Sequence, residues 1–267
     1  MPTEYPPPHH MVRDLRIAIE RSPGMNTAIL PVVPEILSDQ GSVRAGVLAT
    51  MVDMLCGGLA LETAHPTWLA TLDLSLHLLA PLTQGNVFAR GTVLRAGRQT
   101  VVLEVALADD AGTPAGLATM TFALLERRAD TPVFSGDLAP RSELGLPGSG
   151  LTAPFVDLLG IRVLDAAAGV AEVEIHPYIE NSLSALQGGA AATLVDVVSV
   201  ALGRELLGAK VDTTDLEIRY LALGKLGPIR AQARVLRREA RSAALRVEVR
   251  ESGPDARLCY VATTRVG

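Results

Sequence analysis

The chain has 267 residues, of which 48% are hydrophobic and 20% charged, and its net charge at pH 7 is −5. The negative charge argues against a polyanion-binding surface, and the 3% aromatic content argues against stacking platforms for single-stranded nucleic acid. The two cysteines provide neither a disulfide framework nor a metal-binding spacing. We therefore expect a soluble globular protein with no nucleic-acid partner, no metal and no redox cofactor.

The first 44 residues are predicted to contain a tail, a short helix and an interrupted β-rich run. Residues 1–10 are polar and proline-rich, which indicates a loose tail without a signal peptide. Residues 11–21 have the apolar spacing of a short helix. The run 27–37 is rich in β-formers but is interrupted by prolines, which predicts an edge strand or an irregular segment.

A long apolar helix is predicted next, over about residues 45–64, and four strands follow it. Gly85 and Gly97 separate the strand candidates, as expected for hairpin turns. The four candidates are residues 69–79, 86–96, 100–109 and 115–126. One helix followed by antiparallel strands indicates an α+β fold. An almost uncharged helix must be covered on most sides, which a strongly curved sheet would achieve.

The remainder of the chain repeats this order after a linker at 129–150, which is rich in proline and glycine. A second helix is predicted at about 188–207. The strands of this half are predicted near 161–165, 169–177, 212–223, 228–238, 242–251 and 257–265. The predicted organisation is a tail with a short helix (1–22), a first domain (23–128), the linker (129–150) and a second domain (151–267).

The two predicted helices carry the same pentapeptide pattern 143 residues apart. The first copy reads Ala-Thr-Met-Val-Asp and ends at Asp53, and the second reads Ala-Thr-Leu-Val-Asp and ends at Asp196. Each aspartate is the only charged residue in its apolar run, so neither run is expected to span a membrane, and a cytoplasmic location follows. Burying an unpaired carboxylate costs several kcal/mol in order of magnitude. Two carboxylates at matched positions therefore indicate a duplicated domain that keeps them for a function.

The residues before the second helix carry a more specific pattern. They read Asn181-Ser-Leu-Ser-Ala-Leu-Gln187-Gly188-Gly189, and Asp196 follows Gln187 by nine residues. The chain thereby resembles hotdog-fold thioesterases of the phenylacetyl-CoA thioesterase-like branch. That family has Asn-x-x-Gly-x-x-His-Gly-Gly at the helix entrance, with an Asp or Glu nine residues after the His.

The first half carries a more divergent copy of this pattern. It has Ser38, Arg44, Ala45 and Gly46 at the matching positions, and Asp53 follows Arg44 by nine residues. The family His is thus Arg44 in one half and Gln187 in the other.

The resemblance implies two hotdog domains packed back to back as an internal dimer. Each composite site would take a helix entrance from one half and a carboxylate from the other. Backbone N–H groups at the helix N-terminus would stabilise an oxyanion, and the carboxylate would act as general base or nucleophile. The implied activity is hydrolysis of an acyl-CoA thioester, and the internal dimer could assemble further into homo-oligomers. The catalytic candidates are Asp53, Asn181, Gln187, Gly188, Gly189 and Asp196.

A second group of residues is assigned to substrate binding. Its members are Arg44, Gly46, Thr71, Thr213, Arg98 and Arg241. The two arginines of the predicted hairpins, Arg98 and Arg241, could meet coenzyme A phosphates or be ordinary surface charges. Thr71 and Thr213 could serve only as β-formers, and Asn181 only as a turn residue.

The two composite sites are predicted to be unequal. The Asp53 site would keep the amide side chains and the glycine pair. In the other site, Arg44 would pair with Asp196 and lower the pKa of that carboxyl group. Two alternatives remain open for the whole protein. One is a non-catalytic acyl-CoA-binding or scaffold protein with decayed sites, and the other is a hydratase or dehydratase, which usually needs a His.

Overall fold

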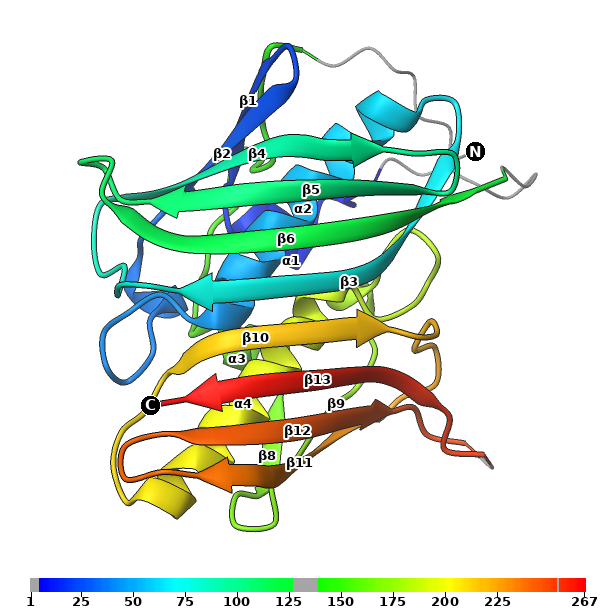
Figure 1. Cartoon of the computed structure of the whole chain (residues 1–267). Helices are drawn as coiled ribbons and strands as arrows, with labels where there is room; N and C mark the ends of the chain where they lie inside the picture. The colour runs from blue at the N-terminus through cyan, green and yellow to red at the C-terminus, as the bar shows by residue number, and fades with distance from the viewer. Residues whose placement is uncertain (1–4, 127–138, 254) are drawn as a thin grey trace.

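The computed structural model describes residues 5–126, 139–253 and 255–267, which form one continuous antiparallel sheet around two long helices (Figure 1). The first half contains α1 (Met11–Asp14), β1 (Ala18–Ser22), β2 (Met25–Pro31), the 3-10 helix η1 (Pro34–Ile36), α2 (Ala45–Ala64), β3 (Trp68–Leu78), β4 (Asn86–Ala96), β5 (Thr100–Ala108), β6 (Pro114–Leu125) and β7 (Arg141–Glu143). The second contains α3 (Phe155–Leu158), β8 (Arg162–Asp165), β9 (Val170–Val173), η2 (Pro177–Ile179), α4 (Gly188–Leu207), β10 (Thr213–Tyr220), β11 (Ile229–Arg238), β12 (Ala243–Arg250) and β13 (Leu258–Val266).

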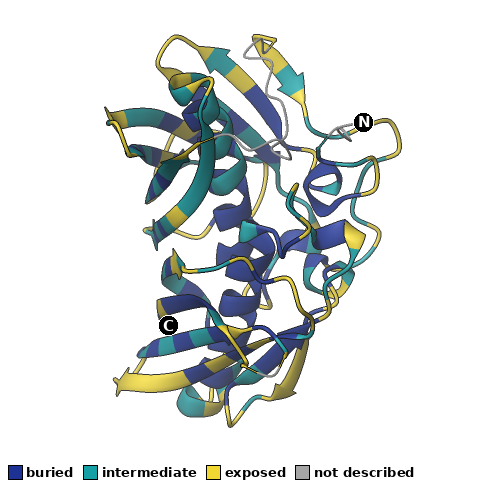
Figure 2. Cartoon of the chain, turned by 90° about the vertical axis from the view of Figure 1, so that its right-hand side faces the viewer, coloured by how far each residue is buried: buried dark blue, intermediate teal, exposed yellow. Residues whose placement is uncertain are grey.

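Each half wraps a curved sheet around one helix of 20 residues. Both helices are apolar on almost all sides, and a helix of that kind is stable only when it is covered all round. The sheet covers one side, and the helices are mostly buried between it and the segments behind (Figure 2). This α+β arrangement of two hotdog units in tandem confirms the predicted fold class.

The two halves join along one strand pair. β3 runs antiparallel to β10, with Leu74 opposite Ile218, so the sheet order is β7-β1-β2-β4-β5-β6-β3-β10-β13-β12-β11-β9-β8. In Figure 1 this seam lies at mid-height, between the blue-to-green half and the yellow-to-red half. The edges that β3 and β10 would otherwise expose are thus paired with each other.

The helices α2 and α4 also meet across the seam, through glycines. A Cβ on Gly189 would lie 2.2 Å from Thr50 Oγ1, and a Cβ on Gly46 would lie 2.5 Å from Thr193 Cα. The hydroxyls of Thr50 and Thr193 donate back to the carbonyls of Gly46 and Gly189. These pairs are related by the repeat, so both halves use a glycine to bring the helix backbones close together.

Two predictions for the first half were wrong. The helix predicted at 11–21 ends at Asp14, because Arg16 has a φ of 53° and residues 18–22 pair with β2 instead. Pairing in the sheet thus overrides the local helical spacing. The sheet of this half begins at Ala18, five residues before the predicted start of the first domain at residue 23. The predicted edge strand is β2, which lies inside the sheet between β1 and β4.

Part of the predicted linker is also a strand. β7 pairs with β1, with Ser142 opposite Ile19, and so extends the first sheet. Residues 129–138 of that linker lie outside the described residues.

Helix α2 is long and apolar enough, by length and composition, to cross a membrane. Within the fold, 67% of its most apolar 18-residue window is buried. Its apolar character is therefore explained by its place in the core.

We expect the two halves to be unable to fold separately. Separation would expose the paired edges of β3 and β10 and the glycine contact between α2 and α4. Expression of residues 1–135 or 145–267 alone should therefore give insoluble or aggregated protein. A soluble, monomeric half with a cooperative unfolding transition would contradict this expectation.

Candidate active site

The N-terminus of α4 places Gln187 against Asp53 of α2. The Gln187 Nε2 donates a hydrogen bond of 2.8 Å to Asp53 Oδ2. The Oε1 of the same amide accepts from the backbone N–H groups of Gly189 (2.5 Å) and Ala190 (3.1 Å), so Gln187 is also the N-cap of α4. Because Oε1 is committed to the helix, the NH₂ group is the one that faces the carboxylate.

Burial changes the acidity of Asp53. Desolvation raises the pKa of its carboxyl group from 3.8 to about 6, against hydrogen bonds from Gln187 and Thr71 that favour the ionised form. Asp53 is nevertheless only partly buried, so the carboxylate can be reached from outside. A reachable carboxylate with a pKa near 6 is suited to work as a general base around neutral pH.

Asp53 opens into a pocket of about 420 Å³. The lining is mainly apolar and includes Tyr5, Met54, Leu61, Trp68, Leu69 and Phe122. Gly57 and Gly58 of α2 also line it, one turn beyond Asp53, and a Cβ on either would meet no atom within 4 Å. The pocket therefore combines one carboxylate with apolar space along the helix, as a site for an apolar group beside a reacting centre requires.

Fewer backbone N–H groups at the start of α4 are available to a ligand than the sequence suggested. Gln187 occupies the N–H groups of Gly189 and Ala190, whereas the N–H of Gly188 has no acceptor within the described residues. The Tyr220 hydroxyl donates 3.1 Å to the Gly188 carbonyl and so holds this first residue of the helix. Gly188, which also lines the pocket, therefore supplies the backbone donor available for an oxyanion.

Asn181 lines the same pocket, but its side chain bonds to the backbone of the loop before α4. Its Oδ1 accepts from the backbone N–H groups of Leu183 (2.9 Å) and Ala185 (3.2 Å), which is the geometry of a turn. Asn181 therefore shapes the loop that delivers Gln187, and this favours the turn interpretation of that residue.

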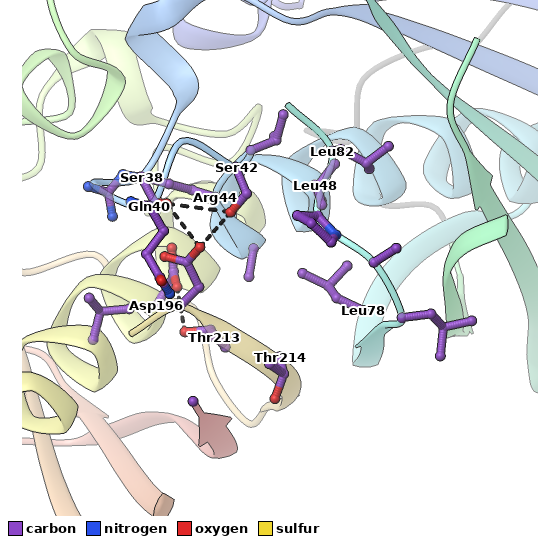
Figure 3. A pocket seen from close by; sticks show the side chains of 18 residues that line it. Ser38, Gln40, Ser42, Arg44, Leu48, Leu78, Leu82, Asp196, Thr213 and Thr214 are labelled. Atoms are coloured by element: carbon purple, nitrogen blue, oxygen red, sulfur yellow. Dashed lines mark hydrogen bonds between the residues drawn. The ribbon is translucent and has the colours of Figure 1, made fainter. Parts of the chain in front are cut away.

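A second group of polar side chains surrounds Asp196, at the position that corresponds to Asp53 in the repeat (Figure 3). The Thr213 hydroxyl donates 2.6 Å to Asp196 Oδ1, and the Gly46 N–H lies 3.4 Å from Oδ2. Arg44 and Asp196 line one pocket of about 330 Å³, which we call the Arg44 pocket. At its rim, the hydroxyls of Ser38 and Ser42 both donate to Asp212 Oδ2.

The prediction for the pKa of Asp196 was wrong. Its carboxyl pKa is raised, because desolvation outweighs the nearby charge of Arg44 and the hydrogen bonds from Thr213 and Gly46. Within the described residues, Arg44 and Asp196 form no ion pair. With only 1% of its surface exposed, Asp196 is far less accessible than Asp53.

Several predicted residues lie elsewhere or act differently. Arg98 and Arg241 are exposed in hairpins and line neither of these pockets. The missing side chains of Gly46 and Gly189 make room for the facing helix, not for a ligand. By contrast, Thr71 and Thr213 each hydrogen bond to the aspartate of their own half, which is more than β-propensity requires.

Two tyrosines near the start of α4 were not predicted from the sequence. Tyr5 lies in the segment predicted to be a loose tail and lines the Asp53 pocket, whereas Tyr220 on β10 bonds to the carbonyl of Gly188. No local pattern marks either residue, because both are placed by long-range packing. Among the described residues, no group of three or more His, Cys, Asp and Glu side chains could hold a metal ion.

Known structures share this architecture along nearly the whole chain. An acyl-ACP thioesterase from Bacteroides thetaiotaomicron aligns with a TM-score of 0.63 at 14% identity, over 92% of this chain and 98% of that one. A conserved protein with a hot dog fold from Alicyclobacillus acidocaldarius aligns with a TM-score of 0.60 at 16% identity, over 96% and 97%. At such identities the likeness shows the fold alone.

The sequence itself gives the family. The model of the thioesterase superfamily matches twice, over residues 40–115 and 184–256, which together make up more than half of the chain. Each match contains one long helix with its aspartate and the first three strands that follow it. The chain therefore belongs to the thioesterase superfamily, as a tandem of two hotdog units.

Proposed function

We propose that this protein is a thioester hydrolase that cleaves an acyl-CoA to the free acid and coenzyme A at the Asp53 site. One observation carries the proposal. The Asp53 carboxylate is open to an apolar pocket and hydrogen bonded to Gln187, at the helix start where the Gly188 N–H has no acceptor among the described residues. Membership in the thioesterase superfamily supports the reaction type.

The proposed reaction uses only groups of this chain. The thioester carbonyl oxygen accepts a hydrogen bond from the Gly188 N–H, and Asp53 removes a proton from a water that attacks the carbonyl carbon. The tetrahedral intermediate collapses, the C–S bond breaks, and the departing thiolate takes up the proton that Asp53 accepted, which returns the carboxylate to its ionised form. Direct attack by Asp53 through an anhydride is the other route open to this geometry, with water then cleaving the anhydride.

The direct test is release of free thiol from a panel of acyl-CoA and acyl-carrier-protein thioesters. Hydrolysis of at least one acyl-CoA, above the rate with the carrier-protein thioester of the same acyl group, would support the proposal. Hydration of crotonyl-CoA in place of hydrolysis would favour a hydratase, and binding without turnover would favour a non-catalytic protein. A cytoplasmic location and independence from metals, nucleic acids and membranes remain predictions.

We expect the rate to depend on pH through Asp53. The ionised carboxylate is the active form of a base or nucleophile, so kcat/KM should fall as pH drops through about 6, the pKa of this group. A carboxyl group with the ordinary pKa of 3.8 would leave the rate flat down to about pH 5. A pH profile of kcat/KM between pH 4.5 and 8.5 checks this, and a flat profile above pH 5 would contradict it.

Gly57→Val should reduce activity without harming the fold. The new side chain enters open pocket space, and any helical residue other than proline is favoured over glycine, by up to about 1 kcal/mol. We expect kcat/KM for bulky acyl groups to fall by roughly tenfold, while the melting temperature stays equal or rises. The repeat places Val200 at the corresponding position of α4, where it lines the Arg44 pocket. Unchanged kinetics would mean that the acyl group does not lie along this face of α2.

A further inference from the structure

Residues 5–10, which we call the N-terminal segment, begin at the wall of the Asp53 pocket and do not form the loose tail that the sequence predicted. Tyr5 and Pro6 line the pocket together with Asp53 and Gln187. The ring of Tyr5 packs edge-on against His10, with ring centroids 5.3 Å apart. The Tyr5 side chain is thus held at the pocket by an ordered neighbour in its own segment.

Hydrogen bonds fix this segment to the loop that carries Gln187. His10 Nδ1 accepts from the Val12 N–H (3.2 Å), so the other ring nitrogen carries the proton and donates 2.9 Å to the Glu180 carbonyl. Glu180 directly precedes Asn181. His10 is fully buried, so this link is shielded from water.

A second set of contacts fixes the segment on its other side. The Arg13 guanidinium donates to the carbonyls of Pro6 (2.6 Å) and Leu144 (3.0 Å). Leu144 also lines the Asp53 pocket. The N-terminal segment is therefore tied to two walls of the pocket.

Among the described residues, the Arg44 pocket has no comparable wall. Helix α3 follows α1 by 144 residues, so Ser149 corresponds to Tyr5, and Ser149 does not line the Arg44 pocket. In the part of the chain that the structure describes, no residue between 139 and 158 lines the Arg44 pocket. A wall of this kind is thus a feature of the Asp53 pocket that the repeat does not duplicate.

We propose that Tyr5 is a specificity-determining residue, whose ring sets the upper size of the acyl group that the Asp53 pocket accepts. This inference rests on the proposed function, because it takes the pocket to hold the acyl part of the substrate. The α2 side of the pocket is open at Gly57 and Gly58, whereas the N-terminal segment places a large, anchored ring at the pocket wall. Removing that ring would enlarge the space for an acyl chain while leaving Asp53 and Gln187 in place.

The test compares Tyr5→Ala and Tyr5→Phe in the full chain, with saturated acyl-CoAs from butyryl to palmitoyl. Tyr5→Ala should raise kcat/KM for the longest acyl groups relative to the shortest by at least about tenfold, and Tyr5→Phe should keep the wild-type profile. Tyr178→Phe is the control. It removes the hydroxyl contact of Tyr178 with Asp14, beside the N-terminal segment but outside the Asp53 pocket, so its profile should not change.

A binding experiment tests the role of Tyr5 independently of the proposed hydrolysis. Non-hydrolysable 2-oxoalkyl-CoA analogues of the same chain lengths are titrated into the wild type and both Tyr5 variants by calorimetry. If no thioester is hydrolysed but Tyr5→Ala shifts the preferred analogue to longer chains, the hydrolase proposal fails and the role of Tyr5 stands. If folded Tyr5→Ala keeps the wild-type chain-length profile in both experiments, or if the wild type binds no analogue, the role of Tyr5 is overturned.

Discussion

Asp53→Asn is expected to lower kcat by about 100-fold or more, because it removes the group that accepts the proton from water. Asp196→Asn should lower kcat by less than about tenfold, since Asp196 is 1% exposed and already bonded to Thr213 and Gly46. The asparagine at position 53 can still accept from Gln187, so the local structure should persist. The measurement is kcat and kcat/KM for both variants on one acyl-CoA that the wild type hydrolyses.

Stability measurements separate lost chemistry from lost structure. At pH 8 the buried Asp53 carboxylate is ionised, and a pKa shift from 3.8 to about 6 corresponds to a cost of about 3 kcal/mol in folding free energy. Because this pKa is raised on folding, the cost is absent below pH 3.8 and grows as pH rises towards 6. Asp53→Asn should therefore be more stable than the wild type at pH 8, with the difference vanishing near pH 4. An inactive Asp196→Asn beside an active Asp53→Asn would reverse our assignment of the working site.

Gly189→Ala should cost more stability than alanine at either of the other two glycines of α4, Gly188 and Gly203. The added Cβ would lie 2.7 Å from the backbone Cα of Thr50, as well as 2.2 Å from its hydroxyl oxygen, so the two helices must move apart. Overpacking of this kind lowers the free energy of unfolding by about 1–3 kcal/mol. Because the Thr50 Cα is a backbone atom and cannot rotate away, we expect a loss at or beyond the upper end of that range. Gly46→Ala meets Thr193 in the same way and should behave alike.

Gly58→Ala is the matched control for both variants. It adds the same methyl group to a helix at a position with no atom within 4 Å, so it should stabilise the protein by about 0.5–1 kcal/mol. Chemical denaturation of the three variants gives the comparison. Equal stabilities for Gly189→Ala and Gly58→Ala would show that the contact between α2 and α4 does not depend on glycine.

The sequence by itself determined the repeat, the two long helices and the carboxylate within each. The helices predicted at 45–64 and 188–207 have these bounds in the structure, because long apolar runs with a single charge can be satisfied only inside a core. The resemblance to hotdog thioesterases also implied that each aspartate would meet the helix entrance of the other half. In the structure Asp53 meets Gln187 and Asp196 meets Gly46, across the two halves.

Only the tertiary structure decided how the two sites differ. The exposure of Asp53 and the burial of Asp196 depend on which segments pack over each site, and such packing has no local sequence signal. The same holds for residues 18–22, which have helical spacing but form β1 because β2 and β7 offer backbone partners on both sides. The anchored ring of Tyr5 at the Asp53 pocket is a further case, since its contacts join residues that are distant in the sequence. Local spacing fixes which face of an element is apolar, whereas long-range packing determines what covers that face.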